Sequence, residues 1–296
     1  MNINDFLELN NPEKYDLKDE NNYFGKNSLE KIMAYKSLKD GFDCDGSGQG
    51  KRKQNYCELV RQIYRVIWGW KDIYVGKDGQ EYVKRYAETY IEDGLLMGPE
   101  TMNSFQTTYN QCKKQYQEDV RFNELMNLWA NVVGRIGNMT LTYAGFNKYI
   151  AYDYWDIKIK RQYIDNISLS EIAKIRYVNF FFQWDYVVIK NKRYEYKAFW
   201  EEHEFKYLPS SLEIIESYIH QIDIYTQRRG VFIYALLKIV SSCEDDYYQI
   251  RDTIFMSEEL FSSYTAVIDR ALKLNFKNEE TVEILKRSMD RINDMK

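Results

Sequence analysis

The amino-acid sequence predicts a mainly α-helical protein with a small antiparallel β element, in which the C-terminal half is helical almost throughout. Apolar residues recur at helical spacing in most segments, which indicates amphipathic helices. One region after Trp70 instead has two short extended runs around an Asp-Gly turn, which is typical of a β-hairpin. A chain of 296 residues with 45% hydrophobic residues and three prolines is long and apolar enough to form a sizeable core.

The N-terminal part is predicted to form two helices separated by a loop. Asn27 and Ser28 can cap a short helix that ends near residue 38, and apolar residues at helical spacing predict a second, amphipathic helix over 56–68. Residues 40–53 form the only glycine-rich stretch of the sequence. Because clustered glycines interrupt regular structure, this stretch is predicted to be a loop.

Extended segments are predicted next along the chain. Residues 73–75 and 80–86 flank the turn at Asp78-Gly79, and this arrangement predicts a β-hairpin. Residues 90–97 are a candidate third strand. These strands would supply the small antiparallel β element of the fold.

The middle of the chain is predicted to contain two helices and an extended piece. Pro99 suits the first turn of a helix, because its missing amide hydrogen is not needed there. Apolar residues at helical spacing predict a second helix over 122–133. Gly134 and Gly137 then interrupt the chain before an extended piece at 139–142.

The C-terminal half is predicted to be a series of helices. An apolar and aromatic helix is expected over 170–189, and Pro209-Ser210-Ser211 opens another with its apolar residues on one face. Further helices are expected over 230–240, 257–274 and 279–295.

Domain organisation is left open between two arrangements. The chain contains no internal repeat and no long low-complexity linker. It is either one compact domain or two parts: residues 1–118, mixed α/β with the hairpin, and residues 119–296, helical with the segment Ile136-Gly137-Asn138.

Charge and composition limit the classes of partner. The formal net charge of −4 gives no general attraction to nucleic acid, although the 41 Lys and Arg residues can still form a local basic face. The 27 tyrosines are typical of an AT-rich bacterial or phage genome, and the tyrosine ring suits half-buried positions where its hydroxyl is hydrogen bonded.

A cytoplasmic location is expected, without a membrane partner. The four cysteines, Cys44, Cys57, Cys112 and Cys243, include no CxxC pair and are predicted to be free thiols. The acidic N-terminus has no apolar core like that of a signal peptide. No apolar run reaches the roughly 18 residues of a membrane span.

The glycine-rich loop has three interpretations. Asp43 and Asp45 are spaced like the first calcium ligands of an EF-hand, so a divalent metal is a candidate cofactor, but the position of the bidentate Glu is taken by Gln54. The second interpretation is a binding loop for phosphate or nucleic acid. The backbone amides at the glycines and the basic side chains of Lys51, Arg52 and Lys53 would together bind the phosphate. The third is an ordinary surface loop.

Histidine-based catalysis has little support. The only two histidines, His203 and His220, lack a second histidine at metal-ligand spacing and a nearby nucleophile in the sequence. Such isolated histidines are usually explained by packing or by a hydrogen bond. The acidic run Glu244-Asp245-Asp246 is interpreted as a solvated helix end.

The adjacent arginines Arg228 and Arg229 have two interpretations of equal weight. Paired guanidinium groups can bind a phosphate or a carboxylate through two parallel hydrogen bonds. Alternatively, they can lock two helices together through buried acids such as Asp223 or Glu216. Both interpretations place the pair at the end of a helix, before Gly230.

One segment resembles a known family. Residues 135–141 (Arg-Ile-Gly-Asn-Met-Thr-Leu), followed by Asn147, Trp155 and Lys158, resemble part of the His-Asn-His nuclease domain of GmrSD-type modification-dependent restriction proteins. In that family this segment forms a short strand beside the active site, and Asn138 would correspond to its asparagine. A later asparagine of the family, on the following helix, would correspond to Asn147. The order of features also resembles a group of bacterial proteins with no established activity.

The resemblance extends to a second segment and departs at one point. Residues 222–239 are similar to the closing helices of that family, with Arg228 or Arg229 as the matching arginine. The family places an Asp-His pair upstream, whose histidine activates water and whose aspartate helps to bind the metal. The first histidine here is His203, so the resemblance implies a shared scaffold without that catalytic base.

Two functional hypotheses follow from the sequence. The motif resemblance favours a nucleic-acid-associated protein of phage defence on a degenerate nuclease-like scaffold. Its contacts would be Lys51, Arg52, Lys53, Asn138, Asn147, Arg228 and Arg229. The net charge favours the alternative, a non-enzymatic regulator or inhibitor that binds another protein.

Overall fold

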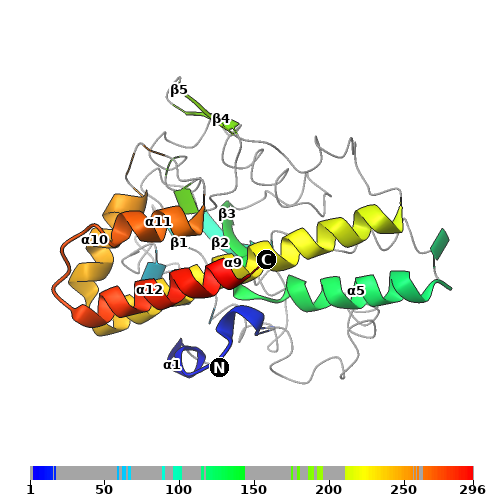
Figure 1. Ribbon diagram of the computed structural model, residues 1–296, viewed down its shortest axis with the longest axis horizontal. Coiled ribbons are helices and arrows are strands. Elements are labelled where there is room, and N and C mark those ends of the chain that lie inside the picture. The colour runs from blue at the N-terminus through cyan, green and yellow to red at the C-terminus, as the bar shows by residue number, and fades with distance from the viewer. Residues whose placement is uncertain are drawn as a thin grey trace, which may run out of the picture.

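The computed structural model shows a mainly α protein with a small antiparallel β element (Figure 1). The residues that the structure describes are 3–15, 17, 59, 62–64, 66–67, 89–90, 96–101, 115–116, 118–143, 175, 179–180, 186–189, 192–195, 211–255, 257, 259 and 263–295. The predicted hairpin at 73–86, the glycine-rich loop and the capped helix before that loop lie outside these residues.

The helices are most extensive in the C-terminal half. They are α1 (Ile3–Leu7), α5 (Val120–Val133), α9 (Leu212–Ser242), α10 (Glu244–Phe255), α11 (Tyr264–Ala271) and α12 (Glu279–Asp294). Two short 3-10 helices, η1 (Pro12–Lys14) and η2 (Ile136–Asn138), lie against α9. The predicted helices over 122–133 and 279–295 are therefore confirmed, and the helical C-terminal half with them.

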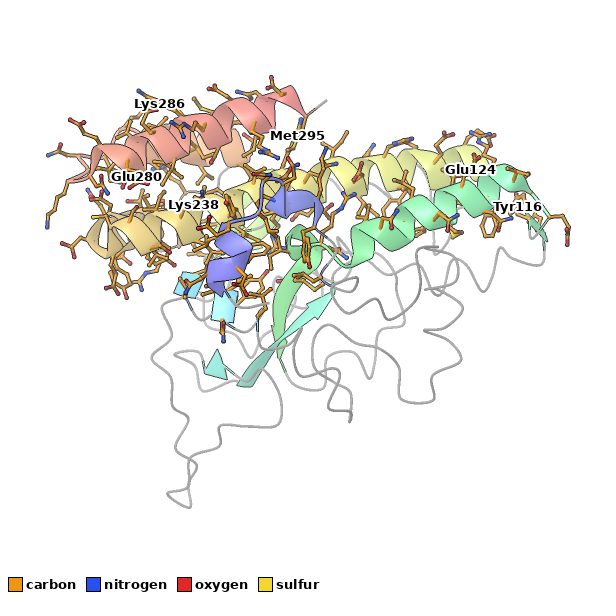
Figure 2. All side chains as sticks on the ribbon, turned by 90° about the horizontal axis from the view of Figure 1, so that it is seen from below. Tyr116, Glu124, Lys238, Glu280, Lys286 and Met295 are labelled. Atoms are coloured by element: carbon orange, nitrogen blue, oxygen red, sulfur yellow. The ribbon has the colours of Figure 1, made fainter. Side chains whose placement is uncertain are left out.

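The long helix α9 organises the rest of the described structure. Helix α5 lies beside the N-terminal part of α9, while α12 lies beside its C-terminal part (Figures 1 and 2). An apolar stripe that includes Ile215, Ile219 and Ile222 faces the core, as the sequence pattern predicts. Because one helix contacts both neighbours, it links α5 in the middle of the chain to α12 near its C-terminal end.

The predicted interruption of α9 at Arg228-Arg229-Gly230 is wrong. The chain is continuous from Leu212 to Ser242, so the helix predicted over 230–240 is the second half of α9. A glycine inside a helix costs about 1 kcal/mol relative to alanine, which is why it suggested a break. Here a Cβ on Gly230 would lie 2.9 Å from Cβ of Glu13, so the glycine admits η1 against the helix.

A three-stranded antiparallel sheet joins distant parts of the chain. Its order is β1 (Thr89–Tyr90), β2 (Leu96–Thr101), β3 (Met139–Tyr143). The candidate strand at 90–97 is thus two strands that fold back on each other, with Tyr90 opposite Leu96. The extended piece at 139–142 is confirmed as β3. The pairing of β2 with β3 crosses the boundary suggested near residue 118.

Pro99 does not begin a helix. It lies in β2, opposite Leu141 of β3, so the prediction of a helix start is wrong. The described pairing of β1 with β2 involves Leu96 and Met97. Proline has no amide hydrogen to donate, so within a strand it is confined to positions where no ladder hydrogen bond needs that hydrogen.

The helix predicted over 170–189 does not extend to its predicted end. Residues 175, 179 and 180 are helical, but Tyr186–Ile189 forms strand β4, which pairs with β5 (Lys192–Glu195). The segment contains Val187, Val188 and Ile189, whose branched Cβ atoms favour extended backbone. Strand pairing therefore prevails over the apolar pattern that suggested a longer helix.

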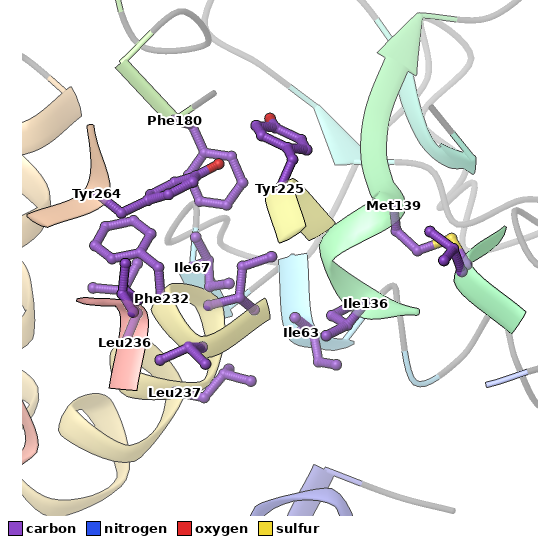
Figure 3. Close-up of a cluster of buried hydrophobic side chains, with 14 of the residues drawn as sticks. Ile63, Ile67, Ile136, Met139, Phe180, Tyr225, Phe232, Leu236, Leu237 and Tyr264 are labelled. Carbon is purple, nitrogen blue, oxygen red and sulfur yellow. The ribbon is translucent and has the colours of Figure 1, made fainter. Parts of the chain in front are cut away.

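The core is rich in aromatic rings. Figure 3 shows Phe180, Tyr225, Phe232 and Tyr264 packed together, and the rings of Phe232 and Tyr264 lie 5.3 Å apart. Among the described residues, several tyrosines are fully buried rather than half-buried: Tyr64, Tyr218, Tyr225, Tyr247 and Tyr264. Among the helices that the structure describes, none combines the length and the hydropathy that a membrane span requires. Cys243 is a free thiol, as predicted.

The acidic run at the start of α10 has one buried member. Glu244 and Asp245 are exposed, but the interpretation of Asp246 as part of a solvated helix end is wrong, because this residue is buried. Its carboxylate accepts hydrogen bonds from the backbone amides of Lys277 and Asn278 at 3.0 and 3.1 Å, and from the Thr281 hydroxyl. It therefore fixes the start of α12.

Replacing Asp246 with asparagine is expected to lower the free energy of unfolding at pH 7 by about 1–2 kcal/mol, since a charged acceptor at a helix start is lost. Burial raises the pKa of Asp246, but the hydrogen bonds outweigh it and hold the pKa below its ordinary value. The contribution of ionised Asp246 to the stability of the folded protein is therefore complete above about pH 4 and is lost as the pH falls further.

Urea unfolding at several pH values would measure both effects. The matched control is Asp245→Asn, since Asp245 is exposed and forms an ion pair with Lys277 at 2.7 Å. That pair is expected to contribute about 0.5 kcal/mol or less. Equal losses for the two variants, or a difference that persists at pH 2, would contradict the role given to Asp246.

Candidate functional site

The structure describes three of the residues predicted to bind nucleic acid. These are Asn138 in η2 and the pair Arg228 and Arg229 in α9. The other candidates lie outside the described residues: Asp43, Asp45, Lys51, Arg52, Lys53 and Asn147. Of the histidines, His220 is exposed, with Nε2 at 3.9 Å from a carboxylate oxygen of Glu216.

Arg229 is the centre of a buried junction between α9 and the turn at η2. Its side chain is fully buried, and its guanidinium donates hydrogen bonds to the carbonyl oxygens of Gly137 (2.9 Å) and Met139. It also donates to the Tyr64 hydroxyl at 2.9 Å, and its Cζ atom lies 4.7 Å from the ring centre of Phe180. These five residues are called the Arg229 junction below.

Gly137 allows the two backbones of the junction to touch. A Cβ atom at this position would lie 1.8 Å from the carbonyl oxygen of Thr226 and 2.8 Å from the amide nitrogen of Gly230. Both atoms belong to the backbone of α9, which cannot move aside as a flexible side chain could. Asn138, the next residue, is fully buried. The Ile-Gly-Asn motif therefore has a packing role.

Three buried tyrosines surround the guanidinium of Arg229. Burial raises the pKa of Tyr64, Tyr225 and Tyr264, and the charge of Arg229 offsets this only in part; the pKa of Tyr225 rises to about 12. Burial disfavours a charged Arg229, but the surrounding phenol oxygens outweigh it and keep its pKa above the ordinary value. The junction thus holds a permanently charged guanidinium among neutral phenols.

The acids considered as partners of Arg228 and Arg229 bind other arginines. Asp223 pairs with Arg135, and Glu216 pairs with Arg121, which also meets Glu213 at 3.0 Å. Arg228 is half-buried and donates to the carbonyl oxygen of Met295. The two adjacent arginines therefore point to different neighbours and do not form a joint anion clamp.

A groove of about 860 Å³ opens between η1, α9 and α12. Its acidic side chains are Glu13, Glu280, Glu283, Asp290 and Asp294. Its basic side chains are Lys238, Arg287 and Arg291. Lys238 and Glu280 mark its position in Figure 2. This α9–α12 groove therefore has more acidic than basic groups along its walls.

Each basic side chain of the groove already has a partner. Arg291 donates to Glu13 at 2.5 Å and to Asn11 at 2.6 Å. The Nζ atom of Lys238 lies 5.0 Å from the ring centre of Tyr234. Arg287 lies 3.9 Å from Glu283, one helical turn away. The groove therefore offers few cationic groups to an incoming ligand.

Several acidic groups of the groove are unpaired. Within the part of the chain that the structure describes, Glu280, Asp290 and Asp294 have no ion pair or hydrogen bond from their side chains. Glu13 is 1% exposed, and its Oε2 atom has no hydrogen-bond partner. Among these same residues, no group of three or more His, Cys, Asp or Glu side chains could hold a metal ion.

Sequence reasoning selected Arg229 but missed the groove. Glu13 and Arg291 are 278 positions apart, so no local pattern connects them. The available signal was the acidic edge of α12, where Asp290 and Asp294 are four residues apart and share a helix face.

Comparison with known proteins adds no relative. No protein-family model, curated protein or solved structure matches the chain. What the protein does must be inferred from its own residues: the Arg229 junction, which is closed to solvent, and the α9–α12 groove, which is open to it.

Proposed function

We propose that this protein acts by binding another protein, as a non-enzymatic regulator or inhibitor in the bacterial cytoplasm. The observation that carries the proposal is the α9–α12 groove, a concave surface in which three exposed acids and the Oε2 atom of the buried Glu13 have no partner among the described residues. Concave sites with a few convergent polar groups are the usual places where proteins take up ligands. The groove is formed by segments from both ends of the described chain, so the fold itself creates it.

The junction that sequence reasoning selected supports this choice indirectly. Arg229 and Asn138 are both fully buried, and the guanidinium of Arg229 is bound to protein groups. A side chain in this position cannot neutralise a phosphate at the surface. The net charge of −4 also opposes general binding to nucleic acid.

A photo-crosslinking amino acid placed at Arg287 of the full chain would test the proposal. Arg287 is exposed and lines the groove, whereas Glu124 is exposed on α5 and serves as the control position. We expect a specific protein adduct from position 287 that survives nuclease treatment, and none from position 124. The adducted protein, once purified, should bind the unmodified chain in a calorimetric titration.

Two outcomes would contradict the proposal. Adducts that are the same at both positions would show that the groove does not select a partner. Adducts that disappear after nuclease treatment would show that nucleic acid, rather than a protein, bridges the two molecules.

A second function, association with nucleic acid in phage defence, is favoured by one observation. Arg229 bonds the carbonyl groups on both sides of Asn138, so the two segments that resemble the GmrSD-type nuclease domain, 135–141 and 222–239, are in direct contact. This contact is what a shared scaffold would require. Such a scaffold would bind nucleic acid through Arg228, Asn147 and the basic loop, without the missing catalytic histidine.

Mobility shift and cleavage assays on modified and plain DNA, with Mg²⁺, Mn²⁺ or Ca²⁺, would test this second function. It predicts binding without cleavage, weakened when Lys51 and Lys53 are replaced by glutamate, and weakened by Asn147→Ala. If the wild-type chain binds no DNA at physiological salt, the second function is excluded and the first stands. Metal-dependent cleavage lost in Asn147→Ala would contradict both.

A further inference from the structure

We propose that the segment bound in the α9–α12 groove is a basic peptide segment of the partner protein, with a Lys or Arg side chain that pairs with Glu13. This inference rests on the proposed function, because it gives the chemistry of the protein partner. Four features support it: the state of the Glu13 carboxylate, the pairing of the basic groups in the groove, the placement of acids on α12, and the absence of a better-suited anion or metal site.

Glu13 is a buried carboxylate that is only partly satisfied. It lies in η1 directly after Pro12, and the absence of a side chain at Gly230 lets it pack against α9. One carboxylate oxygen binds Arg291, while Oε2 has no partner among the described residues. A buried carboxylate oxygen without a donor is costly in free energy. A cationic head group entering the groove would supply the missing donor.

Arg291 does not close the site. Its side chain is 40% exposed, so the charged partner that the described residues give to Glu13 lies at the solvent side of the groove. Arg291 is a long side chain whose head group is partly hydrated already, so it can be displaced from Glu13 without being taken out of water. The groove can therefore admit a second cation next to Arg291 or in its place.

The acids along α12 form an exposed negative edge beside the groove. Asp290 and Asp294 are exposed, four residues apart, in the last part of α12. Like charges at this spacing repel, and negative charges near a helix C-terminus oppose the helix dipole. Glu280 adds a third unpaired acid at the other end of the same wall. A basic partner would relieve both kinds of repulsion.

Other ligands fit less well. An anionic ligand such as a phosphate would need free cationic groups, but Lys238, Arg287 and Arg291 already have partners in the described structure. A metal ion would need three converging ligands, and no such group exists among the described residues. Charge complementarity therefore selects a basic segment.

Fluorescence anisotropy with two labelled peptides would test the inference. The first probe is a short Lys-Ala repeat, and the second is the Glu-Ala repeat of the same length. We expect the full chain to bind the Lys-Ala peptide with an affinity that falls as salt rises, and not to bind the Glu-Ala peptide. The double variant Asp290→Lys/Asp294→Lys should bind the Lys-Ala peptide about tenfold more weakly or worse.

The control has the same change in net charge at a distant surface. Glu118 and Glu124 are exposed at the start of α5, so Glu118→Lys/Glu124→Lys should change the affinity by no more than about twofold. Glu13→Gln keeps the size of the side chain and removes its charge, and should also weaken binding about tenfold. If Glu13→Gln unfolds, the variant Asp290→Lys/Asp294→Lys still tests whether the groove binds the Lys-Ala peptide, because its two positions are exposed.

The outcomes separate this inference from the proposed function. Equal binding of the Lys-Ala peptide to the groove variant and the control variant would overturn the basic partner, as would tighter binding of the Glu-Ala peptide. If a protein is still crosslinked from position 287 in that case, the proposed function survives and only the partner's chemistry is wrong. If position 287 yields no adduct either, both proposals fall.

Discussion

Replacing Arg229 with methionine is expected to lower the free energy of unfolding by about 3 kcal/mol, because three buried acceptors each lose a donor worth roughly 1 kcal/mol. These acceptors are the carbonyl oxygens of Gly137 and Met139 and the hydroxyl of Tyr64. Methionine fills most of the volume of the arginine side chain, so the decrease in the free energy of unfolding measures the contribution of the hydrogen bonds. Arg229→Ala should lose about 4–5 kcal/mol, since a cavity is added.

Urea unfolding followed by far-ultraviolet circular dichroism at pH 7 would measure these losses. Arg228→Ala is the adjacent control, because Arg228 is half-buried and bonds a single carbonyl oxygen near the C-terminus. Its loss should be about 1 kcal/mol or less. If Arg229→Met is as stable as the wild type, the hydrogen bonds of Arg229 add no net stability, and the stabilising role given to this residue is contradicted.

Gly137→Ala is expected to destabilise the protein by about 3 kcal/mol or more, because overpacking against fixed backbone cannot relax. The new Cβ would lie 1.8 Å from the Thr226 carbonyl oxygen and 2.7 Å from its carbon, so η2 must move away from α9. That movement would also break the bonds of Arg229 to Gly137 and Met139. The destabilisation by Gly137→Ala therefore includes part of the destabilisation expected for Arg229→Met, and the two free-energy changes should not add in a double variant.

Thermal unfolding of Gly137→Ala beside Gly230→Ala would check this reasoning. At Gly230 the new Cβ would meet Cβ of Glu13 at 2.9 Å and its Cα at 3.0 Å, so η1 must shift, but about 1 kcal/mol of helix propensity gained by alanine offsets part of that cost. The second variant should therefore unfold a few degrees below the wild type, and the first at a much lower temperature still. An unchanged melting temperature for Gly137→Ala would contradict direct backbone contact at η2.

Where helices follow their own apolar period, the sequence predicted them well. The helix predicted over 279–295 is α12, which spans Glu279–Asp294. The helix predicted over 122–133 is α5, which spans Val120–Val133. In both cases the buried face repeats at the helical period, so local spacing carries the information. The fold class follows from these segments.

Predictions failed where a distant segment outweighed a local preference. Pro99 suggested a helix start but lies in β2, since it pairs there with Leu141 of β3, which is 42 positions later in the chain. Gly230 suggested a break, but α9 continues through it because η1 packs against the helix there. Local propensities of about 1 kcal/mol are smaller than the packing they oppose.

The sequence by itself determined a mainly helical fold with a small antiparallel β element, and the family resemblance that it carries related the pair Arg228 and Arg229 to the Ile-Gly-Asn segment. Only the tertiary structure decided that Arg229 is buried while Arg228 is half-exposed, because consecutive residues on a helix point about 100° apart. It alone joined Glu13 to Arg291 in one groove, since contacts between distant segments depend on packing and leave no periodic trace in the sequence.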